Sequence, residues 1–271
     1  ALLRENRFPM RLLITLLACL MAVSATAQSS ALVTLQTGDD SRGWEGVGRL
    51  DIAGNGFCTA SLIAEDLVLT AAHCVFDYDN TLLSADRFTF QAGLRNGRAE
   101  ATRNVTRFVP HPDYVADGPT SDVAAITNDI AVLRLDRPIR HTRIEPYGIA
   151  ASPDRGDSIG IVSYGAGRED APSLQEICTV LDRQSGTLIM SCDIEHGSSG
   201  APVFTMDGGV PRIVSVVSAI AHAQGDQVAI GTALETPLQV VLATLEAPVQ
   251  GTTNRITVGT HTSTGAKFVR P

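Results

Sequence analysis

The sequence predicts an all-β protein with one helix near its end, and three observations support this. Short β-branched or alternating runs recur between residues 50 and 235. Clusters of Gly, Pro, Asn and Asp separate these runs, as they do in antiparallel barrels and sandwiches. A single helical pattern stands out after residue 235. The chain has 271 residues, 44% of them hydrophobic and 18% charged, which is enough to bury a sizeable core.

The first 27 residues have the pattern of a secretory signal. Met10 and Arg11 precede an apolar run over residues 12–23, and small residues lead up to Ala27. The run is shorter than the ~20 residues of a membrane-spanning helix, so we expect export to a secreted or periplasmic location and no membrane span. A lipoprotein signal ending at Cys19 is an alternative, although the residues before it match the small-residue box of such signals poorly.

The expected mature chain is acidic and keeps an even number of cysteines. Three arginines and one glutamate lie in the first 27 residues, so 21 basic and 29 acidic residues fall to 18 and 28. This balance argues against a nucleic-acid partner. Four cysteines in an exported chain predict two disulfides. Zinc is the alternative, but no Cys-x-x-Cys or His-x-x-x-His spacing occurs, and we expect no metal and no cofactor.

The expected elements follow in order between two polar ends. Residues 28–43 are a polar N-terminal segment or propeptide, residues 44–246 form the main domain, and residues 247–271 are a polar tail. We expect both ends to be loosely attached. Thr236 can cap the late helix, and Pro237 suits its first position. Representative strands are residues 67–70, 102–109, 130–135, 159–164 and 213–218, and the apolar face of the helix consists of Leu238, Val241, Leu242 and Leu245.

The segment that ends in His73 combines a histidine with two cysteines. Two strand-like runs joined by an acidic turn lead into a Thr-Ala-Ala corner, which lets His73 project. Cys58 and Cys74 flank this hairpin, so we expect a bridge between them, which leaves Cys178 to pair with Cys192. An ordinary buried histidine is the alternative, but it would not explain the two flanking cysteines.

An acidic residue, Asp129, stands directly before the apolar run 130–135. The strand would carry the carboxylate into the interior, where a buried charge is costly without a specific partner. Taken alone, this segment would fit an Asp at a turn or strand start equally well. Asp122, the nearest rival, lacks a following apolar strand.

A Gly-x-Ser-Gly-x-Pro turn runs from Gly197 to Pro202. Such a turn exposes the hydroxyl of Ser199 and lets the amides of Gly197 and Ser199 point together as an oxyanion hole. Peptide cleavage by serine needs a hydroxyl, an imidazole that activates it and a carboxylate that orients the imidazole. His73, Asp129 and Ser199 supply these groups in chain order, whereas a polar Gly-Ser turn on its own would carry no such meaning.

These three segments resemble the catalytic motifs of the trypsin and chymotrypsin family. The first is similar to the family's Leu-Thr-Ala-Ala-His-Cys segment, the second to its Asn-Asp-Ile-Ala-Leu-Leu strand and the third to its nucleophile loop. The resemblance extends over roughly residues 46–245. It implies two six-stranded antiparallel β-barrels with a C-terminal helix, and a monomeric serine endopeptidase that cleaves protein or peptide substrates through an acyl-enzyme.

One departure concerns activation. Animal members of the family have an Asp directly before the serine, and it binds a new Ile N-terminus on activation. This chain has Ser198 there and no Ile-Val-Gly-Gly start. In this respect it resembles the bacterial branch that includes the glutamate-specific endopeptidases.

The expected substrate-binding residues are Asp193, His196 and Ser218. Asp193 lies six residues before Ser199, where trypsins keep the carboxylate that binds Arg or Lys. This count predicts a preference for Arg or Lys at the cleaved position, unless a difference in loop length turns Asp193 toward solvent. Glutamate-specific relatives carry a His directly before the position of Ser218, and Val217 there argues against an acidic preference. His196 would lie at the pocket mouth.

Two other functions remain as alternatives. A catalytically silent, protease-like module that binds a partner would usually have lost a triad member, and none is lost here. An α/β-hydrolase esterase could use Asp226 and His261 after the serine. That motif would need Gly in place of Ala201, and Pro202 with a β-branched run follows where a helix should begin.

Overall fold

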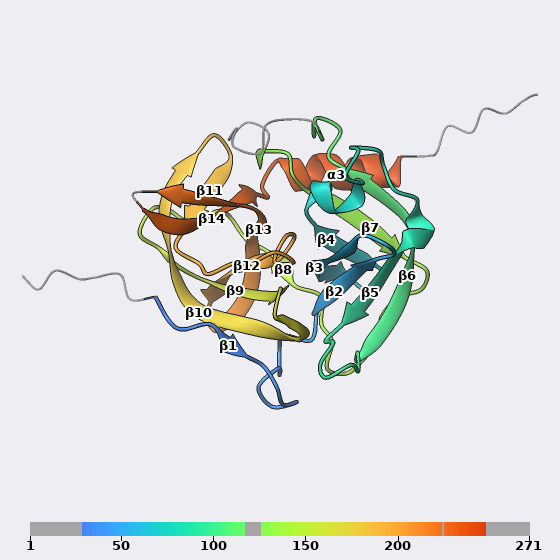
Figure 1. Ribbon diagram of the computed structural model, residues 1–271, viewed down its shortest axis with the longest axis horizontal. Helices are drawn as coiled ribbons and strands as arrows, with labels where there is room; N and C mark the ends of the chain where they lie inside the picture. Colours follow the sequence, from blue (N-terminus) through green and yellow to red (C-terminus); the bar gives the residue numbers. More distant parts are fainter. Residues whose placement is uncertain (1–28, 117–125, 224, 248–271) are drawn as a thin grey trace, which may run out of the picture.

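Strands dominate the computed structural model, which describes residues 29–116, 126–223 and 225–247 (Figure 1). The signal pattern of residues 1–27, the rival Asp122 and the tail from residue 248 onward lie outside the described residues. Among the described helices, none has the length and apolar character needed to cross a bilayer.

The first barrel closes from six antiparallel strands in the order β2-β3-β4-β7-β6-β5, with β5 pairing back to β2. Strand β5 shows why these residues form a barrel wall, because buried Phe88 and Phe90 alternate with half-buried Thr89 and Gln91. Two short 3-10 helices, η1 (Ala72–Val75) and η2 (Ala85–Arg87), connect its strands. The strands are β2 (Val47–Ile52), β3 (Gly56–Ala64), β4 (Leu67–Thr70), β5 (Phe88–Ala92), β6 (Ala101–Pro110) and β7 (Ala131–Leu135).

The second barrel closes in the order β9-β10-β11-β14-β13-β12, with β12 pairing back to β9. A short strand, β8 (Gly148–Ile149), runs parallel to β13. The prediction of two six-stranded antiparallel barrels is confirmed, and Figure 1 shows the two side by side. The strands are β9 (Ser158–Gly165), β10 (Arg168–Gln184), β11 (Thr187–Met190), β12 (Pro202–Asp207), β13 (Val210–Ala223) and β14 (Asp226–Ala233).

The late helix α3 (Pro237–Glu246) follows the second barrel but packs against β6 and β7 of the first (Figure 1). Three of the four residues predicted for its apolar face, Leu238, Val241 and Leu245, are buried, and Leu242 is partly buried against the same core. Thr236 does not cap the helix with its side chain, which corrects the prediction. Its own backbone is already helical, whereas an N-cap side chain acts from an extended residue.

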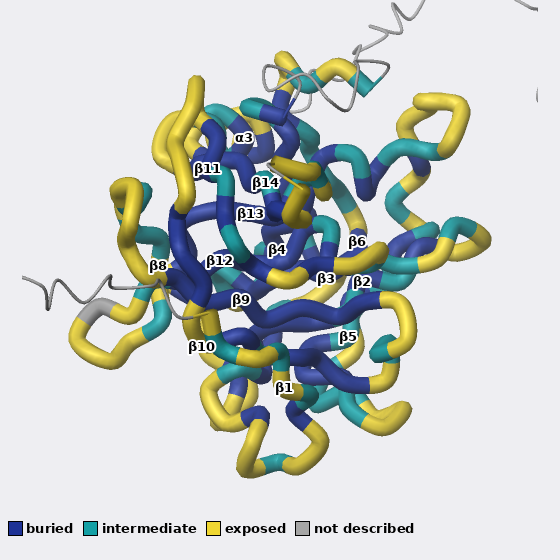
Figure 2. Tube along the Cα trace, turned by 60° about the vertical axis from the view of Figure 1, so that its left-hand side comes forward, coloured by how far each residue is buried: buried dark blue, intermediate teal, exposed yellow. Residues whose placement is uncertain are grey.

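The larger hydrophobic core is continuous across the two barrels. It fills the first barrel, takes in the buried face of α3 and includes Tyr164 and Phe204 from strands of the second barrel. A smaller core, with Ile161 and Val203 among its members, fills the second barrel. Figure 2 shows these buried strands in the interior and the exposed turns around them. The barrels therefore meet through packed side chains, and their relative position is fixed by close contact.

The N-terminal segment from residue 29 to 43 is held more firmly than its polar composition predicts. Strand β1 (Val33–Thr34) pairs antiparallel with β10, so Val33 lies opposite Leu174 and Thr34 opposite Ser173. Backbone pairing of this kind depends on no side-chain pattern, which is why composition alone did not reveal it.

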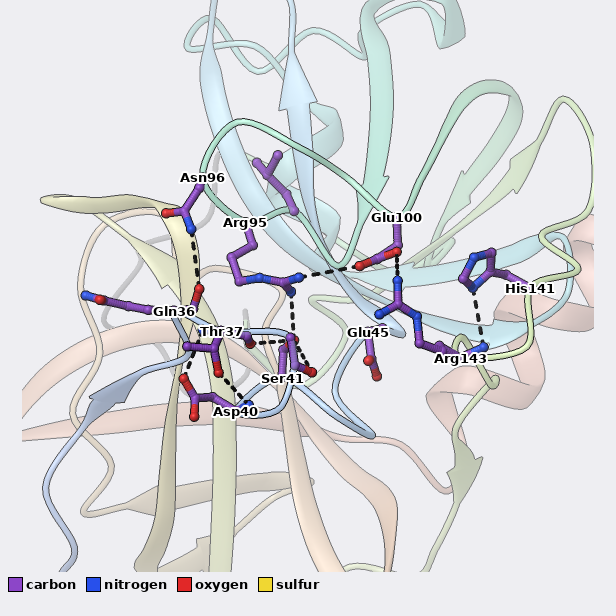
Figure 3. A network of polar contacts seen from close by, with 12 residues as sticks. Gln36, Thr37, Asp40, Ser41, Glu45, Arg95, Asn96, Glu100, His141 and Arg143 are labelled. Carbon is purple, nitrogen blue, oxygen red and sulfur yellow. Dashed lines mark hydrogen bonds and ion pairs between the residues drawn. The ribbon is translucent and has the colours of Figure 1, made fainter.

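Beyond β1 the segment is joined to a turn of the first barrel by the polar contacts in Figure 3. Asn96 Nδ2 donates to Gln36 O at 3.3 Å, and Arg95 Nη1 donates to Ser41 Oγ at 2.7 Å. Arg95 also pairs with Glu100, which in turn pairs with Arg143. The segment therefore touches both barrels before it enters β2.

Candidate active site

His73 lies in η1, directly after β4. Ala71 and Ala72 before it are fully buried, so η1 rests against the core while the His73 side chain stays 34% exposed. Its Nδ1 lies 2.7 Å from Asp129 Oδ2. An ionised carboxylate only accepts hydrogen bonds, so Nδ1 carries the proton. In the neutral imidazole, Nε2 is then left as a proton acceptor.

Asp129 is buried and accepts three hydrogen bonds. The donors are His73 Nδ1, the His73 amide at 2.8 Å and the hydroxyl of Ser218. Burial on its own would raise the pKa of Asp129. The charge of His73 and the hydrogen bonds from His73 and Ser218 outweigh that effect and lower the pKa below 3.8. The carboxylate is therefore ionised at neutral pH.

The same pair sets the protonation of the imidazole. Burial lowers the pKa of His73, but the charge of Asp129 and its hydrogen bond raise it, and the net result lies above 6.5. His73 therefore takes up a proton more readily than a free histidine, as a general base must.

The turn that carries Ser199 depends on two glycines. Gly197 and Gly200 have φ values of +94° and +79°, which a residue with a Cβ rarely adopts. A Cβ on Gly200 would lie 2.0 Å from Thr70 Oγ1 of the first barrel. The Thr59 amide donates to Ser199 O at 2.9 Å. Close approach of the first barrel therefore brings the turn to the same cleft as His73.

A cleft of about 850 Å³ contains all three predicted catalytic residues, His73, Asp129 and Ser199. Within the part of the chain that the structure describes, the Ser199 hydroxyl has no hydrogen-bond partner. Gly197 and Ser218 line the same cleft. The structure thus brings together side chains that lie up to 126 positions apart in the sequence, from His73 to Ser199.

Two of the four amides of the turn, from Gly197 to Gly200, take part in the hydrogen bonds that stabilise it. The Ser198 amide donates to Glu195 O at 2.9 Å, and the Gly200 amide donates to Val217 O at 2.8 Å. The amides of Gly197 and Ser199 alternate with these and have no acceptor among the described residues. Two unpaired amides beside a serine hydroxyl can bind a developing oxyanion.

The predicted substrate-binding residues separate in the structure. His196 is exposed and lines the cleft. Ser218 lines it too, but its hydroxyl is turned to Asp129. Asp193 does not line the cleft: it is exposed, and its carboxylate accepts a hydrogen bond from Gln175 Nε2 at 3.3 Å.

The position of Asp193 corrects the prediction that it forms the base of the specificity pocket. The neighbouring side chain, Ile194, is the one that turns inward and is buried in the second barrel. Gln227 Nε2 fixes this segment by donating to Ile194 O at 2.8 Å. Because successive side chains of an extended segment face opposite ways, burial of Ile194 places Asp193 outside.

Both predicted disulfides are present. Cys58 bonds to Cys74 below His73, and Cys178 bonds to Cys192 at the start of the serine-bearing segment. The sulfurs of Cys58 and Cys74 lie near His73, within reach of a shared ion. Since the disulfide occupies both sulfurs, they are not the thiolates that a metal site would use.

Several residues of the cleft had not been singled out from the sequence. Phe57, Glu169, Glu195 and Ile220 all line it. Glu195 adjoins His196, so its proximity to Ser199 could have drawn notice. Glu169 is the second residue of β10 and lies thirty positions before Ser199, and no local pattern links the two segments.

Comparison with known proteins gives one family and several partial relatives. A family model described as Trypsin matches residues 37–239. Serine protease 56 of Homo sapiens is 31% identical over 143 residues, which are 49% of this chain and 21% of that protein. Coagulation factor IX of Oryctolagus cuniculus is 36% identical over 95 residues, 35% of this chain and 32% of that protein. Mast cell protease 3 of Ovis aries is 28% identical over 135 residues, 47% of this chain and 49% of that protein.

These alignments span less than half of each of these relatives. A solved structure of a Glu endopeptidase in complex with MPD is similar at a TM-score of 0.60 and 21% identity, covering 74% of this chain and 90% of that one. That likeness shows a shared fold. With the family model extending over residues 37–239, well over half of the chain, the chain belongs to the trypsin family.

Proposed function

We propose that this chain is an exported serine endopeptidase with His73, Asp129 and Ser199 as its catalytic triad. The observation that carries the proposal is the pairing of His73 Nδ1 with the buried Asp129 carboxylate at 2.7 Å, in the cleft that Ser199 also lines. The pairing orients the imidazole and leaves its Nε2 free to act as a base.

In the proposed reaction, Ser199 Oγ attacks the carbonyl carbon of the substrate while His73 Nε2 takes the hydroxyl proton. The amides of Gly197 and Ser199 bind the oxyanion that forms. His73 then gives the proton to the leaving amine, and the acyl-enzyme remains. A water molecule then attacks the acyl carbon while His73 Nε2 takes its proton, and His73 returns the proton to Ser199 Oγ as the acid product leaves. Asp129 stays ionised and stabilises the imidazolium.

The two alternatives receive less support. A silent binding module would not need an ionised Asp129 aligned with a partly exposed imidazole beside a serine turn. An α/β-hydrolase needs a helix after its serine, whereas strand β12 follows Ser199 here. The fold is all-β, Asp226 begins strand β14, and His261 lies outside the described residues.

Substrate preference rests on side chains other than Asp193. The exposed position of Asp193 does not support a role in binding Arg or Lys. Glu169 and Glu195 line the cleft instead. Their charges favour cationic over acidic substrate side chains, so we propose a preference for Arg or Lys over Glu through these two residues.

Export is proposed from the signal-like pattern of residues 1–27 and from the two disulfides. Disulfides persist in oxidising compartments, which fits a secreted or periplasmic location. Proteins or peptides would be the substrates, and the enzyme would act as a monomer.

A fluorophosphonate probe tests the proposal directly. It should label Ser199 of the purified chain stoichiometrically, and a peptide library should be cleaved. Ser199→Ala should abolish both labelling and cleavage. Ser158→Ala, at an exposed serine 41 positions before Ser199, should keep both activities. Tryptic mapping of the label to Ser198, or cleavage that survives Ser199→Ala, would reject the assignment. A folded chain that neither reacts nor cleaves would favour the binding module.

A further inference from the structure

An arginine lies directly behind the serine-bearing turn. Arg168 is the first residue of β10, and its guanidinium donates to the backbone oxygen of Ser163. Its Nη2 also lies 3.0 Å from Ser163 Oγ and 3.1 Å from Ser198 Oγ. A cation at the start of β10 therefore reaches the residue that precedes Ser199.

Ser198 is fully buried, and its hydroxyl is fully used. It accepts from Arg168 Nη2 and from the Glu195 amide at 3.2 Å, and it can donate to Tyr164 O at 3.1 Å. A hydroxyl has one proton and two lone pairs, so these three bonds satisfy it. Because Ser198 lies between Gly197 and Ser199, this one side chain connects Arg168 to both unpaired amides of the turn.

The space around the guanidinium is closely filled. A Cβ on Gly165 would lie 2.8 Å from Arg168 Nη2, and the Nε atom of Arg168 is buried without a hydrogen-bond partner among the residues that the structure describes. Burial lowers the pKa of Arg168, although Glu195 and Glu169 oppose the shift. Desolvating a guanidinium is unfavourable unless its contacts return the energy. The three hydrogen bonds to Ser163 and Ser198 and the charges of Glu195 and Glu169 offset this cost.

The N-terminal segment takes a different path. Strand β1 lies on β10 at Ser173 and Leu174, and the following residues contact the Arg95 turn. None of the described residues before β2 forms a hydrogen bond with Ser198. In the described structure, the charged group that contacts the Ser198 hydroxyl is therefore Arg168, a side chain of the same barrel.

We propose that Arg168 is a positioning residue that holds the Gly197–Ser199 amides in their working orientation, so that the turn is competent without a newly released N-terminus. This inference rests on the proposed peptidase function and concerns how its site is kept active. Arg168 acts through Ser198 and touches no substrate. Its loss would let the turn rotate, which would weaken oxyanion binding more than substrate binding.

Arg168→Met tests the inference, with Arg140→Met as the control. Arg140 is exposed and pairs with Glu65 at the surface. Arg168→Met should lower kcat and the rate of fluorophosphonate labelling on the order of 10²-fold, the effect of a lost oxyanion donor, with KM changed by no more than a few-fold. Arg168→Lys should keep an intermediate rate. Arg140→Met should behave as the unaltered chain.

Chemical rescue separates positioning from general stability. Methylguanidinium at millimolar concentration should restore part of the kcat of Arg168→Met, while adding nothing to Arg140→Met. If Arg168→Met does not fold, Ser198→Ala provides the same test, because it removes the acceptor with a small change in volume. Unchanged kcat in a folded Arg168→Met or Ser198→Ala would overturn the inference.

A second measurement addresses the N-terminus. A chain carrying an uncleaved extension upstream of Ser29 should show the same labelling rate as the chain without it. If the extended chain reacted only after trimming, the inference would fail. A failure of the proposed function is distinguishable, because the unaltered chain would then not react with the phosphonate at all.

Discussion

At the scale of single residues, Asp129 controls the protonation of the cleft. It is buried, it accepts three hydrogen bonds, and its charge raises the pKa of His73 above 6.5. Catalysis needs the neutral imidazole, so activity should rise as the pH increases through this raised pKa.

Asp129→Asn should change both the rate and its pH dependence. Without the carboxylate, burial is the main remaining influence on His73, so the pKa of His73 should fall and the acidic limb of kcat/KM should move to lower pH. The wrong tautomer would also be favoured, which reduces kcat on the order of 10⁴-fold in enzymes of this design. The measurement is a pH–rate profile. Asp154→Asn, at an exposed ion pair with Arg183, should leave the profile in place.

The same pair makes folding stability depend on pH at two points. The pKa of Asp129 is lower in the folded state than its ordinary value of 3.8, so ionised Asp129 stabilises the fold at pH values above 3.8. This contribution is lost as the pH falls through the pKa that Asp129 has in the folded state. The pKa of His73 is higher in the folded state than its ordinary value of 6.5, so protonated His73 stabilises the fold at pH values below 6.5. This contribution is lost as the pH rises through the pKa that His73 has in the folded state.

Asp193 and Glu195 offer a matched pair for testing specificity. Because Asp193 lies outside the cleft, Asp193→Ser should leave the ratio of kcat/KM for matched Arg and Glu peptides unchanged. Glu195→Gln should reduce that ratio several-fold, since Glu195 lines the cleft. A ratio that collapses in Asp193→Ser and survives in Glu195→Gln would reverse the assignment.

At the scale of elements, each disulfide closes a short loop next to a segment of the proposed active site: the first loop contains His73, and the second ends seven positions before Ser199. Cys58–Cys74 spans 16 positions and Cys178–Cys192 spans 14. Replacing either pair with Ala should lower the free energy of unfolding by about 3 kcal/mol in the chain-entropy picture. Chemical denaturation measures this. A loss for one pair far below that of the other would mean that the entropy of loop closure is not the main contribution.

Gln175 joins three segments, and its removal should release one of them. It is fully buried, its Nε2 donates to Ser29 Oγ and Ser30 O, both at 2.9 Å, and its Oε1 accepts from the Asp193 amide at 2.8 Å. Gln175→Ala should therefore speed amide hydrogen exchange in residues 29–36 with little change in the barrels. Gln184→Ala, exposed on the same strand, serves as the control. Unchanged exchange in Gln175→Ala would show that β1 pairing alone holds the segment.

Local patterns explain what the sequence could predict. His73, Asp129 and the Ser199 turn each lie in a short motif whose chemistry is readable without the fold, and the cysteines flank those motifs. Asp193 was misplaced because a shift of one residue along an extended segment reverses which side chain faces inward. Arg168 could not be predicted, since its contact with Ser198 joins residues thirty positions apart through the closure of a barrel.

At the scale of the whole molecule, charge should influence how substrates arrive. The chain has a formal net charge of −8, and Asp77, Glu169 and Glu195 line the cleft. These negative charges should attract cationic substrates over long distances, and at 0.1 M salt such attraction is screened over about 10 Å. The kcat/KM of a cationic peptide should therefore fall as salt is raised, while that of an otherwise matched anionic peptide should rise or stay level. Parallel slopes for both peptides would show that local contacts decide the preference.

The first and last described elements each pack on the barrel that lies farther from them in the sequence. Strand β1 comes before the first barrel but pairs with β10 of the second, and α3 comes after the second barrel but packs on the first, where Arg107 Nη2 reaches Thr244 O at 3.4 Å. Each half of the chain therefore stabilises the other half with a segment of its own. Sliding one barrel along the other would have to detach both segments together. The two segments, β1 and α3, therefore hold His73 of one barrel in line with Ser199 of the other. A cut in the connection between the barrels should leave two fragments that stay together and remain active.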